Sequence, residues 1–250
     1  MSVSNTKLYK RIKKQLLNER MSAEELTPIR IRRKLKDKSL SPLLRYRLRS
    51  FLWCKSCALT FSRLKRIREM LNRSLYPKKG ESKSKRIENW MVYNYQLYSV
   101  VFQSILEVMI LLTNEVLDLG YPEKKCKYDP LKENRRVKDW GISPLLEQIY
   151  SDTLKHRENK NKLVHKGQSI SIPEEYKAGK KIEIDISTLT EAVGADESEI
   201  RKFLEEFLAD RKRLGFITKL EDECNSIESK VEQLFDKLLP QYIKMEAFYK

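Results

Sequence analysis

The residue types best suited to chemistry lie in one short stretch, residues 157 to 167, with the sequence Arg-Glu-Asn-Lys-Asn-Lys-Leu-Val-His-Lys-Gly. It contains His165, the second of the chain's two histidines. Histidine can accept or donate a proton near neutrality because its unperturbed pKa is about 6.5. Two cations, Arg157 and Lys160, and the amide of Asn161 precede it. Together these groups predict acid–base chemistry on a phosphate ester, with a cation to stabilise the developing charge.

A helix must position these residues. Gly167 marks the point where that helix would stop. At about 100° per residue, Arg157, Asn161 and His165 are expected along one flank of the buried face. The other histidine, His156, has no motif partner and is assigned no chemical role. The apolar residues that define the helix recur upstream at helical spacing: Leu145, Leu146, Ile149, Tyr150 and Leu154.

The string from Asn161 to Gly167 resembles the end of the active-site helix of HEPN domains. The resemblance implies an all-α bundle, often dimeric, and a metal-independent ribonuclease of the kind found in toxin–antitoxin and antiphage systems. An antitoxin or another regulatory protein would then be a partner. Lys160 stands where the family has an arginine, and the nearest arginine, Arg157, is separated from His165 by seven residues. Either cation is a candidate for the family's arginine role.

The ribonuclease hypothesis gives each residue a task. His165 acts as general base or acid, Arg157 or Lys160 stabilises charge on the phosphate, and Asn161 orients the phosphate or the imidazole; no metal or cofactor takes part. Because eight helical residues rise about 12 Å, one helix cannot easily bring Arg157 to His165. Two antiparallel helices across a homodimer axis could do so. The alternative hypothesis is a non-catalytic HEPN-like module that binds RNA or a partner protein.

The positive charge is concentrated in the first third of the chain. The formal net charge is +16, yet residues 1–90 hold 26 Lys and Arg against 7 Asp and Glu, and the rest hold 25 against 28. Such asymmetry is typical of a polyanion-binding segment, and the alternative is a solvated charged surface. A DNA-binding protein is a further alternative, but the sequence contains no recognisable recognition helix. The predicted RNA-binding residues are Arg30, Arg32, Arg33, Lys34, Arg45, Arg49 and Arg66.

Aromatic and cysteine residues lie among these cations. The aromatic residues could stack on unpaired bases, although such spacings are more often those of a core; they are Tyr46, Phe51, Trp53 and Phe61. Cys54 and Cys57 lack two further ligands at zinc-site spacing, so we expect two thiols on a helix and no metal. Four cysteines without a disulfide pattern or a signal peptide indicate a reducing cytoplasm.

The predicted fold is an all-α, HEPN-like helical bundle spanning 86–250, with a basic helical N-terminal region at 1–85. Thr27-Pro28 should separate a basic amphipathic helix at 7–20 from the next segment. Ser41 and Pro42 should begin a long helix as cap and first residue, and Ser143 and Pro144 should begin the motif helix in the same way. A hinge is predicted at 76–85.

The most apolar segment, 90–119, should be the central helix of the bundle. Gln96, Gln103 and Glu107 interrupt it, and its strongly apolar part is shorter than a membrane span requires, so no membrane is expected. Glu107 should either be paired in the core or face the site. A charged loop at 120–138, a small hairpin at 169–186 and closing helices at 187–214, 215–239 and 242–249 complete the prediction.

Overall fold

The computed structural model describes residues 3–72, 82–168, 170–173 and 196–250. This part of the chain is all-α, which confirms the predicted fold class, and it contains no strand. The predicted hairpin at 169–186 lies largely outside the described residues, as does most of the predicted hinge at 76–85. Residues 170–173, which are described, have no strand conformation.

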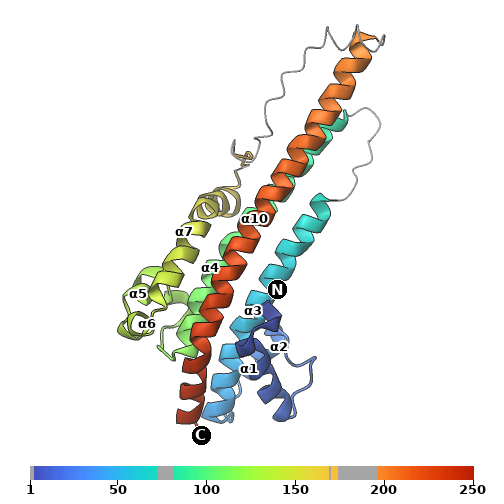
Figure 1. Cartoon of the computed structure of the whole chain (residues 1–250). Coiled ribbons are helices and arrows are strands. Elements are labelled where there is room, and N and C mark those ends of the chain that lie inside the picture. The colour runs from blue at the N-terminus through green and yellow to red at the C-terminus, as the bar shows by residue number, and fades with distance from the viewer. Residues whose placement is uncertain (1–2, 73–81, 169, 174–195) are drawn as a thin grey trace.

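Four long helices form the body of the molecule: α3, α4, α7 and α10 (Figure 1). The smaller helices α1 and α2 lie on one side of the body, and α5 and α6 lie beside α7 on the other. In chain order the elements are η1 (Val3–Asn5), α1 (Lys7–Asn18), α2 (Pro28–Lys34), α3 (Pro42–Leu71), α4 (Lys83–Val116), η2 (Glu123–Lys125), α5 (Tyr128–Glu133), α6 (Arg135–Asp139), α7 (Ser143–Lys160), η3 (Asn161–His165) and α10 (Glu197–Phe248).

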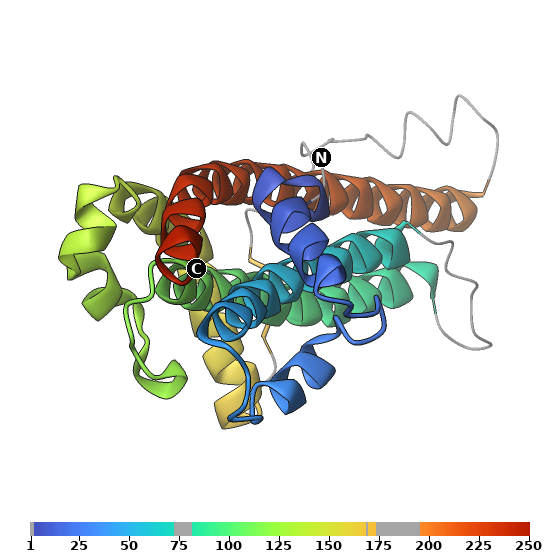
Figure 2. The same ribbon diagram turned by 90° about the horizontal axis from the view of Figure 1, so that it is seen from below.

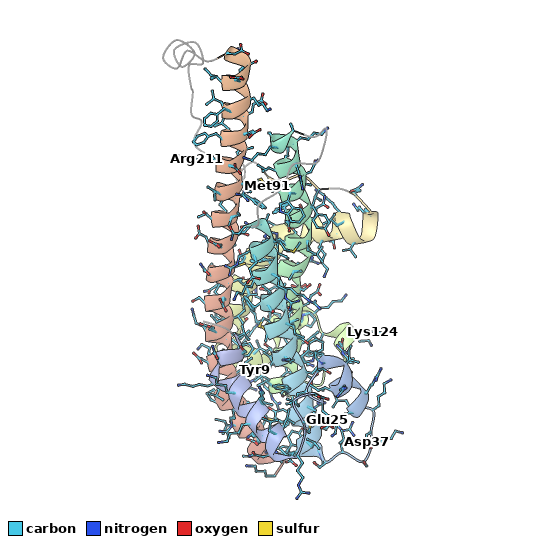
Figure 3. The ribbon with its side chains drawn as sticks, turned by 90° about the vertical axis from the view of Figure 1, so that its right-hand side faces the viewer. Tyr9, Glu25, Asp37, Met91, Lys124 and Arg211 are labelled. Atoms are coloured by element: carbon cyan, nitrogen blue, oxygen red, sulfur yellow. The ribbon has the colours of Figure 1, made fainter. Side chains whose placement is uncertain are left out.

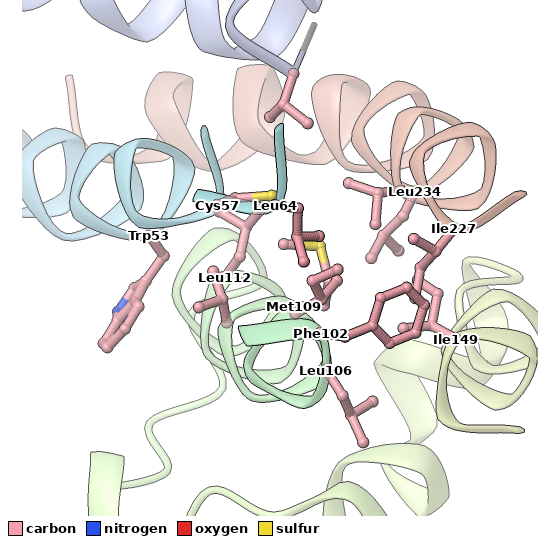
Figure 4. Close-up of a cluster of buried hydrophobic side chains, with 14 of the residues drawn as sticks. Trp53, Cys57, Leu64, Phe102, Leu106, Met109, Leu112, Ile149, Ile227 and Leu234 are labelled. Carbon is pink, nitrogen blue, oxygen red and sulfur yellow. The ribbon is translucent and has the colours of Figure 1, made fainter. Parts of the chain in front are cut away.

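Helix α4 is the central helix, as predicted for residues 90–119, although it begins earlier, at Lys83. It packs against α3, α7 and α10, and Figure 4 shows side chains of all four helices meeting, among them Leu64, Met109 and Ile149. Among the described residues, only α4 is long and apolar enough to cross a membrane, and 61% of its most apolar window is buried in the protein. That burial is typical of a core helix.

The caps of the long helices test the predicted helix starts. Ser41 accepts a hydrogen bond from the backbone N–H of Leu44 at 3.2 Å, and Pro42 begins α3, as predicted. The prediction for Ser143 was wrong, because its hydroxyl donates instead to the carbonyl of Lys132 at 3.3 Å. The predicted loop at 120–138 was also wrong, since η2, α5 and α6 occupy most of it.

Helix α10 is a single helix of 52 residues, not the separate closing helices expected. It passes through Gly215 and Pro240, which lie at the boundaries of the expected helices. A helical Gly costs about 1 kcal/mol and an interior Pro about 3 kcal/mol, but the buried neighbours Phe216 and Tyr242 keep the backbone helical. Figure 2 shows the C-terminal end of α10 turning away from the axis of its longer part, and Pro240 accounts for this bend.

The end of α10 is joined to the N-terminal helices by a buried ion-pair network. Glu246, 1% exposed, forms an ion pair with Arg47 of α3 and with Arg11 of α1, the latter at 3.2 Å. Gln15 of α1 donates to the same carboxylate at 2.6 Å and accepts from the hydroxyl of Tyr242 at 2.9 Å. The first third of the chain and the last helix therefore share one packed core.

The network makes stability depend on pH. Burial raises the pKa of Glu246, but hydrogen bonds from Arg47, Gln15 and Arg11 outweigh burial and lower it below the usual value. A carboxylate with a lowered folded-state pKa contributes stability above its unfolded pKa and loses it as pH falls through the folded value.

We predict that Glu246→Gln lowers the free energy of unfolding by about 2–3 kcal/mol near pH 7, because it removes the buried one of the two carboxylates that pair with Arg47 and leaves only Glu19, at 2.7 Å. The loss should shrink as the pH falls below about 4, where the wild-type carboxylate is also protonated. Urea denaturation between pH 3 and 7 measures both effects. Glu24→Gln, which removes an exposed partner of Arg30, is the control. Equal behaviour of the two variants would contradict a structural role for Glu246.

Candidate functional site

The buried face of α7 is formed by Leu146, Ile149, Thr153 and His156. Arg157 comes one residue after this stripe and is exposed, and Asn161 is exposed as well. Both side chains therefore face solvent beside the buried stripe, and neither belongs to the core.

The end of the motif helix has an unusual backbone. After Lys160 the α-helix widens into a π-helical turn, η3, and Gly167 follows with φ +61°. The N–H of Gln168 donates to the carbonyl of Lys162 at 2.9 Å, which closes the helix end. The prediction that the helix stops at Gly167 is confirmed. The backbone of His165 belongs to this turn, but its side chain lies outside the described part of the structure.

The two candidate cations have different surroundings. Lys160 forms an ion pair with Glu107 of α4, so its charge already has a partner. The alternative that Glu107 is paired in the core was wrong, because its side chain is 54% exposed and its partner is Lys160, one of the candidate site residues. Arg157 is exposed and donates a hydrogen bond to the hydroxyl of Tyr150 at 3.4 Å. Of the two cations, Arg157 therefore has the charge that a phosphate could reach.

His156, to which no chemical role was assigned, is fully buried between α4, α7 and α10. Its Nδ1 lies 3.1 Å from the hydroxyl of Ser99, and its Nε2 lies 3.4 Å from Oε2 of Glu223. Tyr98 donates to the same Glu223 oxygen at 3.1 Å. The ring centroid of Phe102 lies 4.7 Å from that of His156.

Ser99, His156 and Glu223 resemble the serine, histidine and carboxylate of a site for nucleophilic catalysis. Ser99 has no exposed surface, however, so a substrate cannot reach its hydroxyl. The arrangement is a polar network that joins three helices. The spacing of Ile149, Thr153 and His156, at intervals of four and three residues, was the sequence signal that His156 belongs to the core.

Most of the predicted RNA-binding cations have partners within the chain. Arg30 pairs with Glu24, Arg32 with Glu123 at 3.0 Å, Lys34 with Glu25, and Arg49 with Glu115 and Asp118. Arg45 donates to the carbonyls of Leu35 and Asp37 at the end of α2. Arg33 and Arg66 are exposed and have no side-chain partner among the described residues.

The cations of α2 and of the first half of α3 line a cleft of about 530 Å³ that η2 closes on one side. Arg32, Arg33, Lys36 and Arg49 contribute positive charge, and Trp53 and Ile29 contribute apolar surface. Of the four aromatic residues that the sequence suggested for stacking, Trp53 alone lines this cleft, whereas Tyr46 and Phe51 belong to the core. Figure 3 shows Lys124 and Asp37 on the same side of the molecule as α2.

A second groove, between α7 and α10, has the opposite charge. Asp152, Glu158, Asp222 and Glu223 line it together with Lys155. Its carboxylates would repel an RNA phosphate, so the groove is unsuited to a polyanion. The basic cleft is therefore the better candidate for the nucleic-acid interface.

Cys54 and Cys57 are fully buried in α3, and burial raises the pKa of both thiols. A protonated, inaccessible thiol is neither a nucleophile nor a metal ligand. The described residues contain no group of three His, Cys, Asp or Glu side chains that could hold a metal ion.

No family model matches the sequence, and neither curated proteins nor solved structures give a match.

His156 and Arg157 are neighbours in the chain, but one is buried and the other exposed. Truncating them should therefore change the free energy of unfolding by very different amounts. His156→Ala should lower the free energy of unfolding by about 2–4 kcal/mol, because it leaves a cavity and removes the partner of buried Ser99. Arg157→Ala should change it by less than about 0.5 kcal/mol, because that side chain is exposed. Urea denaturation of both variants measures the difference. Similar values would contradict the burial described for His156.

Proposed function

We propose that the protein binds RNA through the basic surface of α2 and α3. The observation that carries this proposal is the cleft in which Arg33 and Lys36 lie beside Trp53. Arginine and lysine supply the electrostatic contacts to phosphate that dominate nucleic-acid affinity. Arg66 lies 17 residues beyond Arg49 on α3, about 26 Å further along this helix and about 100° around its axis.

The interface of this proposal is narrower than the seven residues predicted from the sequence. Cations already paired within the chain gain less from a phosphate, because they must give up or share a carboxylate. Two of the seven predicted residues, Arg33 and Arg66, pair with no carboxylate among the described residues. A phosphate could therefore bind them without displacing a partner. Lys36, absent from the predicted set, joins them because it also has no described side-chain partner.

We predict that the logarithm of the binding constant of the full chain for single-stranded RNA falls linearly with the logarithm of the salt concentration. Arg33→Ala with Arg66→Ala should reduce the slope by about 1.4, since each phosphate contact on a single strand contributes about 0.7. Fluorescence anisotropy between low and moderate salt measures the slope. Arg135→Ala, which removes a charge that is 92% exposed on α6, should leave it unchanged. An unchanged slope in the double variant would reject this interface.

A second candidate function is metal-independent cleavage of RNA at the end of α7, as the HEPN resemblance implies. The observation that favours it is Arg157, an exposed cation one helical turn before Asn161. Figures 2 and 3 show α2 and the end of α7 projecting toward the same side of the body, so an RNA strand on the basic surface could extend toward η3.

In this reaction His165 would take the proton of a ribose 2′-OH, whose oxygen then attacks the adjacent phosphorus. Arg157, contributed across a two-fold interface by a second copy, would stabilise the charge on the phosphate. The 5′ oxygen would leave with a proton from the general acid, and a cyclic phosphate would remain. DNA lacks the attacking hydroxyl and would not be cut.

We predict that the wild-type chain cuts labelled RNA in EDTA and that His165→Ala abolishes cutting while RNA binding is retained. Arg157→Ala should reduce the cleavage rate by several orders of magnitude, and Lys160→Ala only slightly, because Glu107 already neutralises Lys160. Denaturing gels of the products measure the rates. Intact RNA after incubation with the wild-type chain would leave the non-catalytic RNA-binding module as the function.

A further inference from the structure

Two of the residues that line the basic cleft, Arg32 and Trp53, pack on each other and form what we call the platform. The guanidinium carbon of Arg32 lies 5.1 Å from the centroid of the Trp53 ring. The same guanidinium donates two hydrogen bonds to the carboxylate of Glu123, at 3.0 and 3.2 Å. A carboxylate that accepts both bonds fixes the plane of the guanidinium. Figure 4 shows Trp53 directed away from the centre of the core cluster.

The platform has one covered face and one accessible face. Trp53 is 7% exposed, so its ring is largely covered. The side chain of Arg32 is 48% exposed, so its guanidinium can be reached from solvent. Bases of single-stranded RNA stack on arginine guanidinium planes as well as on aromatic rings. The group that a ligand would meet first is therefore the guanidinium of Arg32.

The charge around the platform is positive even after its ion pairs are counted. Glu123 offsets Arg32, and Glu115 offsets Arg49. Arg33 and Lys36 remain without described side-chain partners, which leaves two positive charges at the cleft. Its size, about 530 Å³, is in the range of small-ligand sites. A ligand that combines a planar ring with an anionic group fits this arrangement.

We infer that the cleft holds one unpaired nucleotide of an RNA strand. The base stacks on Arg32, and its phosphate contacts Arg33 and Lys36. This inference rests on the proposed RNA binding and adds a preference for single strands. In a duplex the bases stay stacked on one another, and none can enter the cleft without being extruded at a cost of a few kcal/mol.

The test is a substitution that keeps the positive charge at position 32 and removes the planar guanidinium. Arg32→Lys retains a cation but loses the planar guanidinium and its two parallel hydrogen bonds. Arg135→Lys is the control, because Arg135 lies on α6, does not line the cleft, is exposed and pairs with a single carboxylate, Asp139. Both variants keep the net charge, so a loss specific to Arg32→Lys cannot come from long-range electrostatics.

Fluorescence anisotropy with the full-length chain then compares a single-stranded RNA with a blunt duplex of the same sequence at fixed salt. Wild type and Arg135→Lys should prefer the single strand. Arg32→Lys should lose about tenfold in affinity for the single strand and nothing for the duplex, since one base–platform stack is worth about 1–3 kcal/mol. In a Trp90→Phe, Trp140→Phe background, Trp53 fluorescence should change on adding the single strand and not the duplex.

The outcomes separate the inference from the proposed function. If wild type and Arg32→Lys bind both RNAs equally well, RNA binding stands and the nucleotide cleft is overturned. If no RNA binds, both proposals fail. Adenosine monophosphate is the third ligand. If it changes the fluorescence of Trp53 and neither RNA does, the RNA inference is overturned and the cleft is a site for a free nucleotide.

Discussion

The apolar surface of α4 is the constraint on which the rest of the fold depends. Its buried side chains point toward three different helices, and each large apolar side chain gains about 1.5–3 kcal/mol when it leaves water. Helices α3, α7 and α10 must therefore surround it. Once α3 turns Leu64 and Ile67 inward, Arg63 and Arg66 face solvent. In α7 the inward position of His156 places Arg157 outside in the same way.

The sequence predicted the long helices well because their signals are local. Apolar residues at intervals of three and four define a buried stripe, and Ser41 and Gly167 act within a single turn. The continuity of α10 was not predictable in this way. The local penalties at Gly215 and Pro240 are visible in the sequence, but the burial of Phe216 and Tyr242, which outweighs them, depends on helices far away in the chain.

The candidate site was predicted less well, because charge can be counted from a sequence but its partners cannot. Arg47 belongs to the same basic run as Arg45 and Arg49, yet it is buried against a carboxylate 199 positions later. In the sequence, Lys160 and Arg157 are equivalent candidate cations, and only the structure shows that Glu107 of α4 pairs with Lys160. His156 meets Ser99 and Glu223 from two other helices, and no spacing along α7 could have indicated that meeting.

The junction between α1 and the bent end of α10 also sets an order of events during synthesis. Gln15 and Glu246 are 231 positions apart, so at about 5–20 residues per second the ribosome makes the second on the order of ten to fifty seconds after the first. Throughout that interval Arg11, Gln15 and Arg47 exist without the carboxylate of Glu246, and Arg47 can pair only with Glu19. The nascent chain is therefore most cationic while it is still attached to the ribosome, and the last turns of its final helix complete the packing of its first.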